Sequence, residues 1–145
     1  MSFLSDVNSE NINVFDEIEI KEKPKQEVIN QQEIKIWKEK ILQLIQEEKI
    51  YKNPKLTLFD VAKLLNTNTK TVSNSINSGF EMNFNDFINK YRIEAVKEKL
   101  KNGEHQKSTL LGIAFDCGFN SKATFNRAFK KNTSLSPKDY LKKLG

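Results

Sequence analysis

The chain has 145 residues, with 24 Lys and Arg against 19 Asp and Glu, and this length favours one domain or two small lobes over a large catalytic architecture. Its longest apolar run covers only residues 110–115 and its acidic opening lacks an apolar stretch, so we expect a cytoplasmic protein with neither a membrane span nor a secretory signal. A single cysteine, Cys117, excludes an intramolecular disulfide, and a single histidine, His105, leaves too few ligands for structural zinc, so no metal or cofactor is expected.

The charge is unevenly distributed along the chain. Residues 1–33 hold eight acidic and three basic side chains, a net charge of −5, so the other 112 residues carry +10. Clustered Lys and Arg attract phosphates and displace their counterions, so a basic body with an acidic arm favours a nucleic acid as the partner. On charge alone, a basic surface that binds nothing is the alternative.

Residues 1–33 are predicted to form an acidic, disordered arm, because they show no helical period and mix Asn, Glu, Lys and Gln around Pro24. Within the arm, only residues 14–20 hint at a strand. Residues 34–145 are predicted to form the folded domain. It begins with a packed helix that ends before Asn53 and Pro54. The apolar stripe of this helix consists of Ile34, Trp37, Ile41, Leu44 and Ile45.

An internal repeat is the most informative feature of the domain. Apolar residues at positions i, i+3, i+4 and i+7 occur twice, and each set is followed by a residue that tolerates a left-handed backbone, Asn66 or Gly118. A second stripe then follows in each copy. The first copy consists of Leu58, Val61, Ala62, Leu65, Val72, Ser75 and Ile76, and the second of Leu110, Ile113, Ala114, Cys117, Phe125, Ala128 and Phe129. This pattern predicts two helix-turn-helix motifs, at about 56–78 and 109–132.

Between the two copies, residues 84–101 are predicted to form one long connecting helix. At 100° per residue, its apolar side chains lie on one face in the first half and on nearly the opposite face in the second half. The first face holds Phe84, Phe87, Ile88, Tyr91 and Ala95, and the second holds Ile93, Val96 and Leu100. Such a helix suits a rigid spacer between two lobes, and Asn102 and Gly103 are predicted to end it.

A closing helix is predicted to start at Ser136, with Pro137 at its first position and Asp139 completing a capping box. Tyr140, Leu141 and Leu144 would anchor this helix. Together the elements predict an all-α fold with two helix-turn-helix lobes joined by a long helix.

These segments resemble the DNA-binding domain of the AraC-type (AraC/XylS) transcription regulators. The resemblance covers about residues 35–145 and implies a seven-helix domain in two lobes, DNA binding, transcription regulation and no catalytic residues. RNA polymerase is then a second candidate partner beside double-stranded DNA. The segments that carry the resemblance are LTLFDVAKLLNTNTKTVSNSIN, FINKYRIEAVKEKL, IAFDCGFNSKATFNRAFKK and LSPKDY.

Two departures from the family pattern change what the resemblance implies. The family usually has Gly in the turn before its Ser-Pro motif, where this chain has Ser134, a residue that disfavours positive φ. Many members carry a sensor of domain size before the DNA-binding part, and residues 1–33 are too short to form one, so no small-molecule pocket is expected. Residues 34–65 also resemble the cytosolic end of membrane-spanning relatives, which makes the output module of a larger sensor an alternative.

The second helix of a helix-turn-helix enters the major groove, with the side chains opposite its core stripe toward the bases. Arg and Lys donate to guanine, Asn pairs with adenine, and Ser and Thr serve bases or phosphates. A merely solvated face is the alternative. The outward residues predicted to bind DNA are Thr69, Lys70, Ser73, Asn74 and Asn77 in the first motif, and Ser121, Lys122, Thr124, Asn126, Arg127, Lys130 and Lys131 in the second. The resemblance independently places Lys70, Asn74, Lys122 and Arg127 at DNA-contact positions of the family.

Other chemically notable residues favour structural roles. Cys117 lies on a core stripe and is predicted to be a buried thiol, whereas His105 lies in a polar stretch and is predicted to be exposed. Arg92 is predicted to form a structural ion pair. Trp37 and the ten Phe residues are predicted to be core rather than a platform for stacked bases, because they fall on helical stripes.

The leading functional hypothesis is a sequence-specific transcription regulator that reads two adjacent major-groove segments of double-stranded DNA. A protein-interaction adaptor built from the same two lobes is the second hypothesis. An enzyme is not expected, because the sequence has no P-loop, no paired acid cluster and no Ser/His/Asp arrangement.

Overall fold

The computed structural model describes residues 31–145. Residues 1–30 of the predicted arm, including the strand suggested by residues 14–20, lie outside the described residues. The chain divides into two units, residues 1–36 and 37–145. In the first unit, the described residues 31–36 are helical and Ile36 is exposed. All regular structure in the described part of the chain is helical, which confirms the all-α prediction. None of these helices is long and apolar enough to cross a membrane.

The second unit starts with a helix that changes its hydrogen-bonding pattern before it ends. Residues 37–43 are α-helical, η1 (Leu44–Glu48) is a π-helical turn, and η2 (Ile50–Lys52) is a 3-10 turn. Lys49 between the two turns has a left-handed φ of 52°. Four of the five residues of the predicted stripe are confirmed, because Ile41 and Ile45 are buried with Trp37 and Leu44 packed beside them. The fifth, Ile34, is half-buried and belongs to neither core cluster. The two turns that are not α-helical were not predicted.

The first helix-turn-helix consists of α2 (Leu58–Leu64) and α3 (Thr69–Phe80). A complete capping box starts α2: Asp60 N donates to Thr57 Oγ1 at 3.1 Å, and Thr57 N donates to Asp60 Oδ2 at 2.9 Å. The predicted turn residue, Asn66, has a left-handed φ of 59°. The buried side chains around this motif form one cluster, the first-lobe core: Ile41, Ile45, Tyr51, Val61, Ala62, Val72, Ile76, Phe87 and Ile88.

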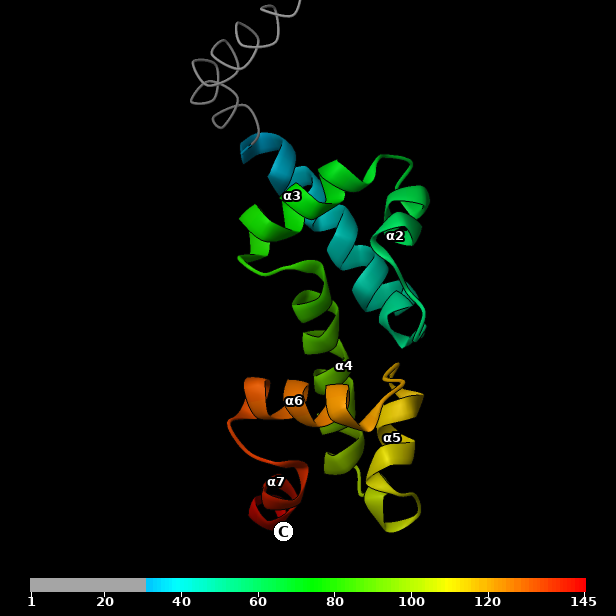
Figure 1. Cartoon of the computed structure of the whole chain (residues 1–145), viewed down its shortest axis with the longest axis vertical. Helices are drawn as coiled ribbons and strands as arrows, with labels where there is room; N and C mark the ends of the chain where they lie inside the picture. The colour runs from blue at the N-terminus through cyan, green and yellow to red at the C-terminus, as the bar shows by residue number, and fades with distance from the viewer. Residues whose placement is uncertain (1–30) are drawn as a thin grey trace, which may run out of the picture. The chain divides into compact units, whose positions relative to one another are not determined.

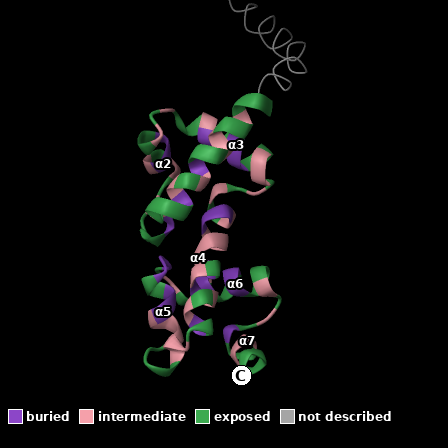
Figure 2. Cartoon of the chain, turned by 180° about the vertical axis from the view of Figure 1, so that it is seen from behind, coloured by how far each residue is buried: buried purple, intermediate pink, exposed green. Residues whose placement is uncertain are grey.

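The connecting helix, α4 (Phe84–Lys101), has the predicted bounds and runs from the first motif to the second (Figure 1). Phe87 and Ile88 in its first half belong to the first-lobe core, whereas buried residues of its second half belong to a separate cluster. Figure 2 shows buried positions along the whole of α4. The predicted change of apolar face is therefore confirmed. Ala95, near the middle of α4, packs against both clusters.

The second lobe contains the short turn η3 (Glu104–Gln106) and three helices, α5 (Leu110–Asp116), α6 (Lys122–Thr133) and α7 (Pro137–Leu144). With the helix at residues 37–43, α2 to α7 make seven α-helices among the described residues, as the family resemblance implied. The buried side chains form the second-lobe core: Ile93, Val96, Leu100, Ile113, Ala114, Cys117, Phe119, Phe125, Ala128 and Phe129.

The turns of the second lobe test two predictions about local conformation. Ser134 adopts a left-handed φ of 65° although it stands where the family usually has Gly. Ser136 caps α7, because its Oγ accepts a hydrogen bond from Asp139 N at 3.1 Å, and Pro137 occupies the first turn as predicted. The return bond from Ser136 N to the Asp139 carboxylate is not among the hydrogen bonds of the described residues, so the predicted capping box is formed in one direction only.

Candidate nucleic-acid interface

The outward face of α3 carries a row of neutral polar side chains and one lysine. Val72, Ser75 and Ile76 are buried, which fixes the orientation of the helix. Four of the five predicted contact residues are exposed, and Ser73 is half-buried. On that face Asn77 Nδ2 donates to Ser73 Oγ at 3.4 Å, so these two side chains are neighbours. The exposed four are Thr69, Lys70, Asn74 and Asn77.

Helix α6 has the same length as α3, 12 residues, and is oriented by the equivalent buried stripe of Phe125, Ala128 and Phe129. Its outward face is cationic, because four of its predicted contact residues are positively charged. The exposed members of the predicted set are Lys122, Asn126, Arg127, Lys130 and Lys131. Helices α3 and α6 therefore expose nine of the twelve residues that the sequence assigned to DNA, and these are mostly neutral on α3 and mostly cationic on α6.

Ser121 and Thr124, which were also predicted to bind DNA, are half-buried and hydrogen-bonded to each other. Ser121 is the N-cap of α6, and its Oγ accepts from Thr124 N at 3.0 Å. The two side-chain oxygens are also 3.0 Å apart. These contacts build the first turn of α6, so the two hydroxyls have a structural function in the free protein.

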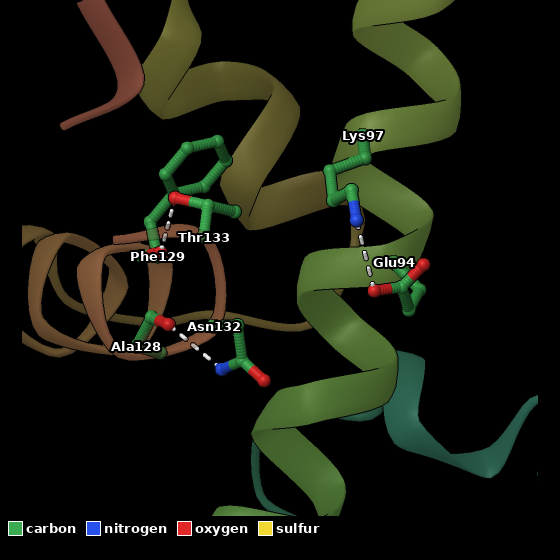
Figure 3. Close-up of polar contacts among 6 residues, drawn as sticks. All are labelled: Glu94, Lys97, Ala128, Phe129, Asn132 and Thr133. Carbon is green, nitrogen blue, oxygen red and sulfur yellow. Dashed lines mark hydrogen bonds and ion pairs between the residues drawn. The ribbon is translucent and has the colours of Figure 1, made fainter. Parts of the chain in front are cut away.

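The last turn of α6 uses most of its polar side chains internally. Asn132 Nδ2 donates to Ala128 O at 2.8 Å, and Thr133 Oγ1 donates to Phe129 O at 2.7 Å (Figure 3). Lys131 Nζ lies 2.7 Å from Asp86 Oδ2 on α4. Among the ion pairs of the described residues, none involves Lys130, which is exposed.

A groove of about 620 Å³ adjoins the outward face of α6, and the sequence did not predict any such depression. It combines apolar side chains with three lysines from α6 and α7. One of the three, Lys138, was missed by sequence reasoning, although its place directly after Pro137 at the start of α7 could have indicated it. The lining residues are Leu110, Leu111, Lys122, Phe125, Asn126, Lys130, Ser136, Pro137 and Lys138.

Arg92 on α4 has a structural function, but the predicted ion pair is wrong. Its guanidinium donates to backbone carbonyls, from Nε to Tyr51 O at 2.7 Å and from Nη2 to Asn53 O at 2.9 Å. Nη1 donates to Asn89 Oδ1 at 3.1 Å. Burial lowers the pKa of Arg92 below its ordinary value. The carbonyls at the end of η2 thus take the place of the expected carboxylate.

The other structural predictions are confirmed in part. Cys117 is fully buried, and burial raises the pKa of its thiol to about 11, so it is a neutral core residue. His105 is half-buried rather than exposed, and its Nδ1 is buried without a hydrogen-bond partner. Phe59 and Phe115 are 64% and 46% exposed, so the prediction that every Phe is core is wrong. In residues 31–145 no cluster of His, Cys, Asp and Glu could hold a metal ion.

Comparison with known proteins agrees with this architecture. A family profile described as a helix-turn-helix domain matches residues 61–143. The structure of a protein of unknown function from Listeria innocua is similar to this chain, with 26% identity, 72% of this chain and 93% of that chain covered, and a TM-score of 0.61. The C-terminal domain of AraT, a response regulator from Geobacillus stearothermophilus, is similar with 29% identity, 66% of this chain and 76% of that chain covered, and a TM-score of 0.58. No curated protein matches the sequence.

Proposed function

Because the chain belongs to the AraC-type helix-turn-helix family of DNA-binding regulators, which are not enzymes, we propose that it reads two adjacent major-groove segments of double-stranded DNA as a sequence-specific transcription regulator. The observation that carries the proposal is the repeated geometry of α3 and α6. Each is a capped helix of 12 residues with one buried stripe and, on the opposite, exposed face, side chains that can hydrogen-bond to bases.

The chemistry of each face supports a division of roles between the two helices. On α6, Lys122 and Arg127 donate to guanine and Asn126 pairs with adenine, whereas Lys130 contacts phosphate. Lys138, across the groove from α6, is a second phosphate contact. On α3, Asn74 reads bases through neutral hydrogen bonds. The second lobe thus supplies most of the attraction to phosphate, and the first lobe adds selectivity.

Residues 34–145 are sufficient for this activity in our proposal, and residues 1–33 are dispensable for specific binding. Removing the arm also removes a net charge of −5, which leaves a more basic protein. Truncation should therefore preserve the preferred sequence and raise affinity for unrelated DNA. The likeness to the C-terminal domain of a response regulator supports the same role, as the DNA-binding output of a regulatory system.

Selection from a random duplex library, followed by footprinting of the selected site, tests the proposal. We expect two protected groove segments on one face of the duplex, about 34 Å or one helical turn apart. The double variant Asn74→Ala and Arg127→Ala should lose the selected preference and keep its helical content. A single protected segment, or selection of no common sequence, would contradict the proposal.

A protein-interaction role is the second candidate, and exposed apolar side chains on α2 favour it. Phe59 is 64% exposed and Leu64 is 57% exposed, so α2 offers apolar contact area to a partner protein. A subunit of RNA polymerase or a sensor protein would be the partner in this second role, and a transcription assay tests the polymerase. If α2 contacts the polymerase, replacing Phe59 with Ser should reduce transcription from a bound promoter and leave DNA binding unchanged. If α2 does not contact the polymerase, the replacement should change neither transcription nor DNA binding.

A further inference from the structure

The turn of the second helix-turn-helix lies directly against the backbone at the end of η2. Gly118 in this turn has a φ of 112°, and a Cβ added there would overlap the carbonyl oxygen of Tyr51. The same Cβ would lie 2.7 Å from Arg92 Nε and 3.1 Å from Lys52 Cα. Only glycine therefore allows the two backbones to come this close.

Arg92 connects the same two parts of the molecule through its side chain. Two of its nitrogens donate to the carbonyls of Tyr51 and Asn53, and the first of these carbonyls belongs to a residue of the first-lobe core. The guanidinium carbon also lies 5.9 Å from the ring centre of Phe119, a residue of the second-lobe core. One planar, charged group thus contacts both lobes at once.

A junction of this kind constrains the lobes more than the connecting helix can alone. With α4 as the single link, the lobes could still rotate slightly against each other by bending the helix. Gly118 and Arg92 contact residues 51–53, a segment outside α4 that includes a residue of the first-lobe core, and so they add a connection between the lobes. Since α3 and α6 are each packed by a buried stripe into their own lobe, a rotation at the junction would displace them relative to each other.

We infer that Arg92 and Gly118 form a clamp that fixes the separation of α3 and α6 and thereby sets the spacing between the two DNA segments that the protein accepts. This inference rests on the proposed reading of two segments. Neither residue needs to touch DNA, so they are positioning residues for specificity. If Arg92 did no more than cap the η2 carbonyls, it would stabilise the fold but would not affect which spacing of the two DNA segments the protein accepts.

The test measures affinity for duplexes in which the two segments are moved apart or together by one, two or five base pairs. Each base pair changes the separation by about 3.4 Å and the angle by about 34°, so a clamped protein should lose about tenfold in affinity at a displacement of two base pairs. Arg92→Lys keeps the charge but not the planar guanidinium. For this variant we expect the loss of affinity at a displacement of two base pairs to be only about threefold. Lys97→Ala is the matched control, because Lys97 lies on the same helix and, within residues 31–145, its one ion pair is with Glu94.

The controls separate this inference from the function on which it rests. Affinity for a duplex with the first segment alone, and for one with the second segment alone, should be equal in all three proteins, which would show that each lobe is intact. If a duplex with both segments binds no more tightly than a duplex with one segment, the reading of two segments fails. If the wild type binds both segments equally well at every spacing, the clamp is wrong. If the wild type has a preferred spacing and Arg92→Lys keeps the same narrow profile, the clamp is wrong while the proposed function stands.

Distance measurements on the free protein keep the inference testable even if the Arg92 variant does not fold. Spin labels at exposed positions 63 on α2 and 143 on α7 report the distance between the lobes, since buried, protonated Cys117 does not react. The wild type should give one narrow distance distribution, and Arg92→Lys a broader one. A broad distribution in the wild type would overturn the clamp without any variant.

Discussion

Lys131 on α6 and Asp86 on α4 form an ion pair between the two lobes, with Nζ 2.7 Å from Oδ2. Asp86 also belongs to the first turn of α4, where its backbone N donates to the cap residue Asn83 at 2.8 Å. The pair therefore connects the end of one recognition helix to the start of the connecting helix. It also separates Lys131 from its neighbour Lys130, which has no such partner among the described residues.

This difference predicts unequal contributions of two adjacent lysines to DNA binding. Lys130→Ala should weaken binding to all sequences about equally, because one phosphate contact is lost. The salt slope, which is the slope of the logarithm of the binding constant against the logarithm of the salt concentration, should become shallower by about one unit. Lys131→Ala should change the slope by clearly less, since that charge is already partly compensated by Asp86. Affinity measured over a series of salt concentrations decides, and equal slopes for the two variants would contradict the prediction.

Base reading is predicted to differ between the two recognition helices. Arg127→Ala should cost roughly 1 to 3 kcal/mol of binding free energy and relax the preference at one base position, because a bidentate contact to guanine is lost. Asn74→Ala should alter the preference in the other segment with little change in salt slope. Selection of bound sequences with each variant measures both effects. A uniform loss of affinity in Asn74→Ala would place Asn74 on phosphate instead.

Ser121 allows helix capping to be separated from DNA contact. Ser121→Ala removes the cap of α6 and should cost about 1 kcal/mol of unfolding free energy. Ser121→Asp keeps an acceptor at the N-cap, so stability should be retained, but the added negative charge at the start of α6 should weaken DNA binding. Thermal unfolding and a binding titration measure the two effects. Wild-type binding by Ser121→Asp would mean that the start of α6 does not approach DNA.

Two glycines with left-handed backbones provide a matched test of the close approach at the junction. Gly103→Ala should cost about 1 to 2 kcal/mol for the φ of 80° alone, because the nearest atom to its added Cβ is 3.9 Å away. Gly118→Ala should cost at least about 1 kcal/mol more, since its Cβ meets the backbone of η2. Denaturant unfolding compares them. An equal loss of unfolding free energy in the two variants would show that the turn at Gly118 can move away from η2 without cost.

The raised pKa of Cys117 predicts a loss of stability at alkaline pH. Burial raises this pKa from 9.0 to about 11, so between those values the thiol ionises in the unfolded chain but not in the folded one. The stabilisation is complete below about pH 9 and is lost as pH rises to about 11, by at most about 2 to 3 kcal/mol. Burial raises the pKa of Tyr51 as well, which adds a loss of the same sign.

Urea unfolding at several pH values checks this prediction. Cys117→Ala should be less stable at neutral pH because of the smaller side chain, but its stability should fall less steeply between about pH 9 and 11. A slope unchanged by Cys117→Ala would assign the whole effect to other groups such as Tyr51.

Features encoded by neighbouring residues could be predicted from the sequence. The bounds of α4 and the buried stripes of both motifs follow from a period of 3.6 residues, which every residue on one face of a helix shares. The left-handed turns at Asn66 and Gly118 follow from the residue types themselves. For the same reason, the outward side chains of α3 and α6 could be identified before the structure was known.

Features that join distant residues could not be predicted in this way. Two of the three partners of Arg92 lie about 40 positions away in the sequence and are backbone carbonyls, which carry no residue signature. The pair of Lys131 with Asp86 and the groove beside α6 also depend on how helices pack. Phe59 and Phe115 show a further limit of sequence-based prediction: both are apolar but exposed, because residue type does not by itself decide burial.

The shared position of Ala95 has a consequence for folding cooperativity. Although the repeat makes the two lobes look like separate modules, neither has a complete core without its half of α4, and Ala95 packs against both cores. If one lobe melted, α4 would lose half of its buried surface and with it the stability that holds the other half helical. We therefore expect residues 37–145 to unfold as a single cooperative unit, and a lobe excised without its half of α4 not to fold.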